Sequence, residues 1–211
     1  MGKFDKMNVL TYSSGYNWSN IIEKLAEGKL VVYPTDTIYG IAANINDIEA
    51  VKRVYQVKDR ARTKAISVCF HDFEQLRKYA VLTPELISVI KKLLPGSYTV
   101  LLYKKDTIND IITADSSKIG VRIPDNNVSY ELTRYFPITS TSANISNQKT
   151  PDNIPEIKEK LGDSIDCYID AGKMTNNDAS TIIDLTKSRP HLIRKGACDD
   201  RLLDDILKIN L

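Results

Sequence analysis

The fold is decided by VVYPTDTIYG (residues 31–40) and, after a helical spacer, KDRARTKAI (residues 58–66). Two apolar runs, residues 30–33 and 65–70, have the composition of buried strands. Hydroxyl side chains follow the first run and cations precede the second: Thr35, Thr37 and Tyr39, then Lys58, Arg60 and Lys64. Hydroxyls and cations are the usual equipment for binding phosphates and carboxylates. This stretch therefore predicts two sides of one pocket for an anion.

Strands and helices alternate along the rest of the chain, without a regular strand–helix–strand period. Predicted strands cover residues 7–12, 30–33, 65–70, 98–103, 118–124, 137–141, 167–169, 180–185 and 191–194. Predicted helices cover 18–27, 46–58, 72–79, 84–94, 128–136, 154–161 and the tail from 199, with a capping box at Asn46 and Glu49. This pattern predicts an α/β or α+β fold with a twisted mixed sheet, in one domain over residues 1–211.

Composition indicates an ordinary globular protein. Of the 211 residues, 42% are hydrophobic and 27% charged, and the net charge of +2 argues against extensive nucleic-acid coating. Three scattered cysteines fit a reducing compartment, and two histidines without metal-ligand spacing predict no protein-bound metal. With no apolar run near 18 residues and no signal-like start, we expect a cytoplasmic protein without a membrane span.

Other polar residues also follow or close predicted strands, where α/β folds usually bind ligands. These are Arg122 within KIGVRIP, the STSAN run from Ser140 to Asn144, Ser180 and Arg194. Each has a structural alternative, such as a solvated turn, an exposed strand arginine or a capped turn. The chain contains no GxxxxGK[ST] loop, no GxGxxG after a strand and no serine–histidine–aspartate arrangement. The residues alone thus predict only an α/β protein with an anion pocket.

Six motifs in order carry a family resemblance: PTDTIYG, KDRARTKAI, VRIP, STSAN, STIID and LIRKG. Together they resemble the YrdC/TsaC-type L-threonylcarbamoyladenylate synthases, over residues 17–196, in the short single-domain form with a helical tail at 197–211. The resemblance implies a YrdC-like twisted mixed sheet, flanked by helices around a concave basic cavity. It also implies synthesis of threonylcarbamoyl-AMP and pyrophosphate from L-threonine, bicarbonate and ATP.

The resemblance also implies roles for individual residues. Lys58 and Arg60 would be catalytic. Threonine and bicarbonate would contact Thr35, Thr37, Tyr39, Arg122, Ser142 and Ser180. ATP would contact Lys58, Arg60, Lys64, Lys118, Ser140, Asn144 and Arg194. Two departures stand out: many members read KPL where this chain has Lys64-Ala65-Ile66, and Cys69 stands where some relatives have histidine near threonine.

As cofactor, Mg²⁺ is expected to arrive with ATP. The expected partner is a downstream transferase that delivers the threonylcarbamoyl group to the adenosine next to the anticodon of tRNA, with direct tRNA contact left open. Two alternatives remain at this point: a non-catalytic double-stranded RNA- or tRNA-binding module, and a carbamoyl-transfer domain like that of hydrogenase-maturation proteins. Near-neutral charge without clustered aromatics argues against the first, and the absence of zinc-finger cysteines against the second.

Overall fold

The computed structural model describes residues 9–12, 17–175 and 178–211, which form a ten-stranded sheet in the order β1-β8-β2-β3-β7-β4-β6-β5-β9-β10. The strands are β1 (Val9–Thr11), β2 (Val31–Tyr33), β3 (Gly40–Ala42), β4 (Ser67–Cys69), β5 (Tyr98–Tyr103), β6 (Lys118–Arg122), β7 (Ile138–Ser142), β8 (Cys167–Asp170), β9 (Thr181–Asp184) and β10 (His191–Arg194). β2 pairs in parallel with β8 and antiparallel with β3. The predicted mixed sheet is confirmed.

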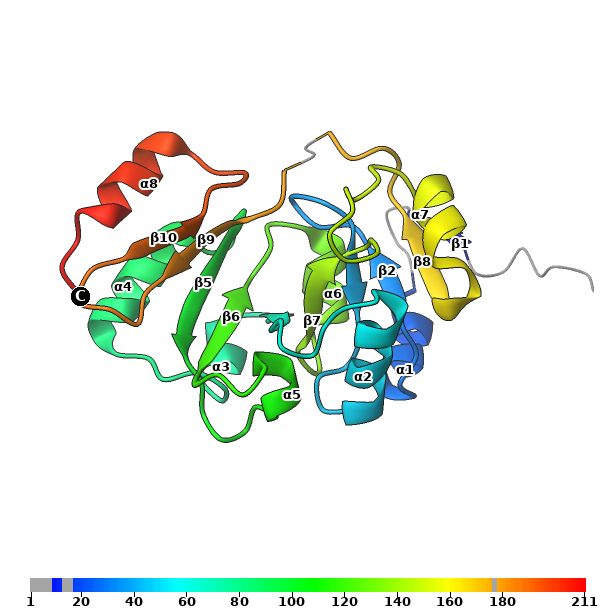
Figure 1. Cartoon of the computed structure of the whole chain (residues 1–211), viewed down its shortest axis with the longest axis horizontal. Helices are drawn as coiled ribbons and strands as arrows, with labels where there is room; N and C mark the ends of the chain where they lie inside the picture. The colour runs from blue at the N-terminus through cyan, green and yellow to red at the C-terminus, as the bar shows by residue number, and fades with distance from the viewer. Residues whose placement is uncertain (1–8, 13–16, 176–177) are drawn as a thin grey trace, which may run out of the picture.

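Helices flank this sheet. They are α1 (Ser19–Ala26), α2 (Ile48–Val57), α3 (Phe73–Leu76), α4 (Pro84–Leu93), α5 (Asp110–Thr113), α6 (Asn127–Leu132), α7 (Ile154–Leu161) and α8 (Asp200–Leu207). Figure 1 shows α4 and α8 with β9 and β10 at one end of the sheet, and α7 with β8 at the other. In the described part of the chain, no helix is long and apolar enough to cross a lipid bilayer.

Strand β2 explains why the first apolar run, residues 30–33, contains no polar residue. Its three residues are fully buried, and they alternate between two apolar clusters. Val32 packs in the larger cluster, whereas Val31 and Tyr33 pack in the smaller one. Because successive side chains of a strand point to opposite faces, a sheet covered on both faces needs apolar residues at every position.

Local differences from the sequence expectations have physical causes. The N-cap of α2 is Asp47, whose Oδ1 accepts from the amides of Glu49 and Ala50 at 3.0 Å each, so the capping box predicted at Asn46 is wrong. Asn44 accepts the amide of Asn46 in a turn that delays the helix by one residue. The sequence does not predict strand β3, because its three residues, Gly-Ile-Ala, follow the turn directly and show no alternation of polar and apolar side chains. Residues 7 and 8 of the first predicted strand lie outside the described part.

Candidate functional site

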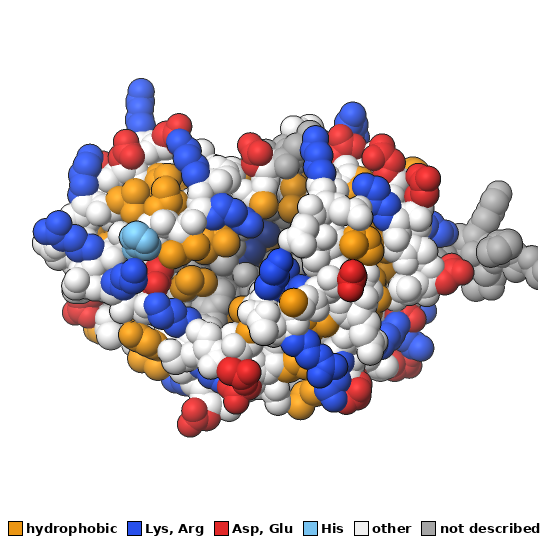
Figure 2. Space-filling model, in the orientation of Figure 1, with side chains coloured by type: hydrophobic (Ala, Val, Ile, Leu, Met, Phe, Trp, Pro, Cys, Tyr) orange, Lys and Arg blue, Asp and Glu red, His pale blue; other side chains and the backbone are white. Residues whose placement is uncertain are grey.

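A cavity of about 190 Å³ opens where the central strands meet the turn between β2 and β3. It collects nine of the predicted site residues, contributed by β6, β7, β10 and the intervening loops: Thr35, Thr37, Tyr39, Arg60, Arg122, Ser140, Ser142, Ser180 and Arg194. Figure 2 shows a hollow near the middle of this face, with basic side chains in it and at its rim. Among the described residues, no carboxylate lines this cavity. Its chemistry therefore suits an anion, as the sequence predicts.

The hydroxyl turn between β2 and β3 is held by its own hydrogen bonds. The Oγ1 of Thr35 donates to the carbonyl of Ile38 at 2.8 Å and accepts the amide of Thr37 at 3.1 Å. The two threonine hydroxyls lie 3.0 Å apart, and both residues are buried. Gly40 follows the turn, and a Cβ there would lie 3.1 Å from the ring of Tyr33, a tight contact. The turn thus presents its hydroxyls to the cavity in a fixed arrangement.

Tyr39 fixes another part of the wall. Its hydroxyl donates to the carbonyl of Gly172 at 2.7 Å and accepts the amide of Ala171 at 3.0 Å. Burial raises the pKa of Tyr39 to about 12, so the phenol is neutral. The hydroxyl is therefore engaged with the segment that follows β8, while the side chain still lines the cavity.

Arg122 pairs with a carboxylate that the sequence analysis did not select. Its Nη2 lies 2.7 Å from the Oδ1 of Asp36 and donates to the Oγ1 of Thr37 at 3.2 Å. Asp36 also accepts the amide of Asp125 at 3.2 Å. The Nε of Arg122 is buried without a partner in the described structure. The guanidinium therefore carries one buried donor without an acceptor, beside the cavity that Arg122 helps to line.

One signal in the sequence could have identified Asp36. An arginine in a buried strand needs a compensating charge, and Asp36 is the acid inside the hydroxyl turn. The spacing of the predicted strands does not show that the hydroxyl turn lies against β6, because Asp36 and Arg122 are 86 residues apart along the chain.

Lys58 was expected at the phosphates, but its ammonium group is fully buried outside the cavity lining. It donates to the carbonyl and Oδ1 of Asn144 at 2.9 and 2.8 Å, and to the carbonyl of Ser142. Burial and then the nearby Arg60 lower the pKa of Lys58 to about 7. Lys58 thus holds the STSAN segment against the end of α2. Asn144 likewise lies outside the lining.

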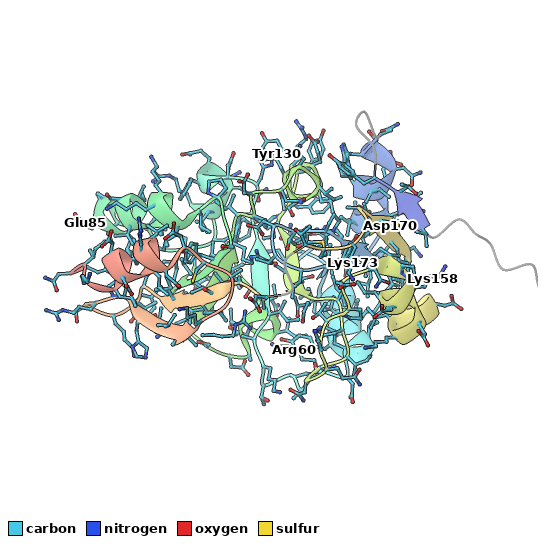
Figure 3. The ribbon with its side chains drawn as sticks, turned by 90° about the horizontal axis from the view of Figure 1, so that it is seen from above. Arg60, Glu85, Tyr130, Lys158, Asp170 and Lys173 are labelled. Atoms are coloured by element: carbon cyan, nitrogen blue, oxygen red, sulfur yellow. The ribbon has the colours of Figure 1, made fainter. Side chains whose placement is uncertain are left out.

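The cationic run after α2 divides between two environments. Arg60 lines the cavity, with Nε and Nη2 donating to the carbonyls of Lys64 and Ala65 at 3.0 and 2.7 Å. Burial lowers the pKa of Arg60. Figure 3 places Arg60 near the middle of the molecule, between the half with β9 and β10 and the half with α7. Lys64 is exposed and donates to the Oδ1 of Asn147 at 3.0 Å, outside the lining.

Arg194 and Ser180 form a further part of the cavity lining. The Nη2 of Arg194 donates to the carbonyl of Ser180 at 2.7 Å, and the Ser180 hydroxyl lies 2.7 Å from that of Thr99. Partial burial, followed by the nearby charge of Arg122, lowers the pKa of Arg194. Gly196 permits this arrangement, because a Cβ there would lie 1.9 Å from the carbonyl oxygen of Ala179.

Two further residues lie apart from the cavity. Lys118 begins the strand that Arg122 ends, and its ammonium group pairs with Asp184 at 2.8 Å. Burial alone would raise the pKa of Asp184, but hydrogen bonds from Lys118 and Thr186 keep it below its usual value. Cys69 is fully buried next to Arg122 in register, and burial raises the pKa of its thiol to about 12. It is therefore a neutral thiol within the apolar core.

The chain matches a known family over most of its length. The family pattern Sua5/YciO/YrdC, described as "Telomere recombination", covers residues 23–196. The chain belongs to the Sua5/YciO/YrdC family. A relative from Methanocaldococcus jannaschii, provisionally named a threonylcarbamoyl-AMP synthase, is 39% identical over 82% of this chain and 83% of its own length. The threonylcarbamoyl-AMP synthase of Pyrococcus abyssi is 35% identical over 88% of this chain, which spans only 54% of that protein.

A solved structure of the family resembles this one closely. The crystal structure of P. abyssi Sua5 complexed with L-threonine superposes with a TM-score of 0.88 and 30% identity, over 95% of this chain and 61% of that chain. The expected Sua5/YciO/YrdC fold, a mixed sheet flanked by helices, is thereby confirmed.

Proposed function

We propose that the protein is an L-threonylcarbamoyladenylate synthase, a nucleotidyltransferase that makes threonylcarbamoyl-AMP and pyrophosphate from L-threonine, bicarbonate and ATP. The observation that carries this proposal is the cavity itself, in which three arginines and the hydroxyls of the PTDT turn and STSAN converge. Support comes from the names of the relatives and from the threonine bound to the P. abyssi protein.

The threonine subsite is proposed around the hydroxyl turn. Arg122 would bind the substrate carboxylate through its guanidinium group, while Thr35, Thr37, Tyr39, Ser142 and Ser180 surround the rest of the amino acid. A carboxylate is matched by guanidinium donors, and the substrate hydroxyl by hydroxyl side chains.

The ATP subsite is proposed on the side of Arg60, Ser140 and Arg194. Lys58 and Asn144 would contribute indirectly, because the hydrogen bond between them fixes the STSAN segment. Lys64 would reach ATP from its exposed position near Arg60. Lys118, which the sequence predicts as an ATP contact, is engaged by Asp184 and does not line the cavity, so it is left out of the proposed subsite. Among the described residues, the cavity lining holds no carboxylate to anchor Mg²⁺, so the ion would be carried by the ATP phosphates.

In the proposed reaction, the ammonium group of threonine gives a proton to solvent, and bicarbonate takes up a proton and loses water to give CO₂. The free amine then forms a bond to the carbon of CO₂, one C=O π bond opens, and a second N–H proton passes to solvent, which leaves the carbamate. An oxygen of the resulting carbamate then attacks the α-phosphorus of ATP, and the bond to the β-phosphate oxygen breaks to release pyrophosphate. Positioning of the reactants supplies much of the acceleration, up to about 7–11 kcal/mol in the best-oriented intramolecular cases. Arg60 would stabilise charge developing on the leaving pyrophosphate.

The product is proposed to pass to a tRNA threonylcarbamoyl transferase in the cytoplasm. The test is to incubate the protein with ATP, bicarbonate and each amino acid, and to search for the adenylate adduct by mass spectrometry. We expect an adduct only with threonine or a close analogue, and none when bicarbonate is depleted. Labelled tRNA binding without any adduct would instead support an RNA-binding module.

A further inference from the structure

The three arginines of the cavity differ in how their charge is compensated. Arg60 and Arg194 donate to uncharged backbone carbonyls, and in the described structure neither has a carboxylate within ion-pair distance. Arg122 alone pairs with an acid, at 2.7 Å. The positive charge is therefore uncompensated at Arg60 and Arg194, and largely offset at Arg122.

The compensating carboxylate lies behind Arg122, out of reach of a ligand in the cavity. Asp36 lines a neighbouring hollow, and its side chain is only 11% exposed. One of its oxygens accepts from Arg122 and the other from the amide of Asp125. Asp36 is thus a positioning residue, whose charge acts on a ligand through Arg122.

We propose that Asp36 decides which anion the Arg122 end of the cavity accepts. With its charge offset, Arg122 suits the single carboxylate of a zwitterionic amino acid. A phosphate dianion is best held by two uncompensated cations, and Arg122 and Arg194 both line this cavity. Without the charge of Asp36, Arg122 and Arg194 would together form a site of two uncompensated cations. Phosphates would then bind in the proposed threonine subsite. The inference rests on the proposed function only in assigning this end to threonine.

The variant Asp36→Asn tests the effect of the charge apart from the positioning of Arg122. It removes the negative charge but keeps a side-chain oxygen that can accept a hydrogen bond from Arg122. Asp125→Asn is the matched control. It removes an equal charge nearby, but Asp125 is exposed and meets Asp36 only through its backbone amide. Calorimetry with inorganic phosphate should show about tenfold or more tighter binding for Asp36→Asn than for the wild type. Asp125→Asn should bind phosphate as the wild type does.

Inhibition kinetics with inorganic phosphate provide a second, independent measurement. In the wild type, phosphate should compete with ATP and not with threonine, whereas in Asp36→Asn it should compete with both. Unchanged phosphate affinity in Asp36→Asn, an equal gain in Asp125→Asn, or competition with threonine in the wild type would each overturn the proposal. If the wild type forms no adduct at all, the proposed function is wrong. The phosphate affinities of the wild type and the two variants would still test the role proposed for Asp36.

Discussion

The ammonium group of Lys58 lies 2.8 Å from the Oδ1 of Asn144, a residue that follows it by 86 positions. The bond joins the end of α2 to the segment that leaves β7. Lys58 therefore stabilises the cavity wall from behind, and its charge is expected to influence both folding and catalysis.

The stability of the fold should depend on pH through Lys58. Its pKa is lowered from 10.5 to about 7, so between these values the unfolded chain binds a proton that the folded protein lacks. Unfolding free energy should therefore rise with pH across this window. Urea denaturation of the wild type and Lys58→Met at pH 6.5 to 10 tests this, with Lys52→Met as an exposed control. If the difference in unfolding free energy between the wild type and Lys58→Met stays constant from pH 6.5 to 10, the three oxygen acceptors keep Lys58 charged in the folded protein.

Activity should depend strongly on Lys58 and Arg122. Lys58→Ala and Arg122→Ala should each abolish pyrophosphate release that depends on threonine and bicarbonate, because one supports STSAN and the other meets the substrate carboxylate. The measurement is a coupled pyrophosphate assay on variants whose circular dichroism matches the wild type. Arg134→Ala, which removes an exposed arginine paired with Glu131, should retain full activity. Near-normal turnover of a well-folded Arg122→Ala would refute its assignment.

Lys118→Met should separate a structural role from ATP binding. It removes one partner of the buried Asp184 and should destabilise the fold by about 1–3 kcal/mol. Because Lys118 does not line the cavity, the KM for ATP should stay within about twofold of the wild type, a difference well under 1 kcal/mol. Steady-state kinetics and urea denaturation measure the two effects. A large increase in that KM would support the ATP contact predicted from the sequence.

Gly196→Ala should impair the Ser180 wall. The added Cβ would lie 1.9 Å from the carbonyl oxygen of Ala179, so the two segments must separate. We expect lower thermal stability and a higher KM for threonine, measured by thermal melts and kinetics. Lys195→Ala is the control, since its ion pair with Asp200 is exposed and contributes little. An unchanged melting temperature in Gly196→Ala would show that the backbone relaxes without cost.

Most residues of the cavity can be predicted from the sequence, because hydroxyl residues and arginines follow or end apolar runs. When those runs form strands, these side chains lie together at one edge of the sheet. The sequence could not show that Lys118 lies outside the cavity, because the partner that engages its ammonium group, Asp184, comes from β9, 66 residues further along the chain. Asp36 was missed for a related reason. Its partner is 86 residues away, and the hydrogen-bonding register that joins them is absent from local patterns.

Strand β7 pairs antiparallel with β3 on one side and β4 on the other, and so forms the seam between the two parts of the sheet. The PTDT turn belongs to one part, whereas Arg122 and Arg194 belong to the other. Each part combines two separate stretches of the chain: β1 to β3 with β8 in one, and β4 to β6 with β9 and β10 in the other. The chain therefore passes between the two parts repeatedly, and no single cut separates them. Adenylate synthesis requires all four stretches to fold together, so its recovery after denaturation would report directly on reassembly of the whole sheet.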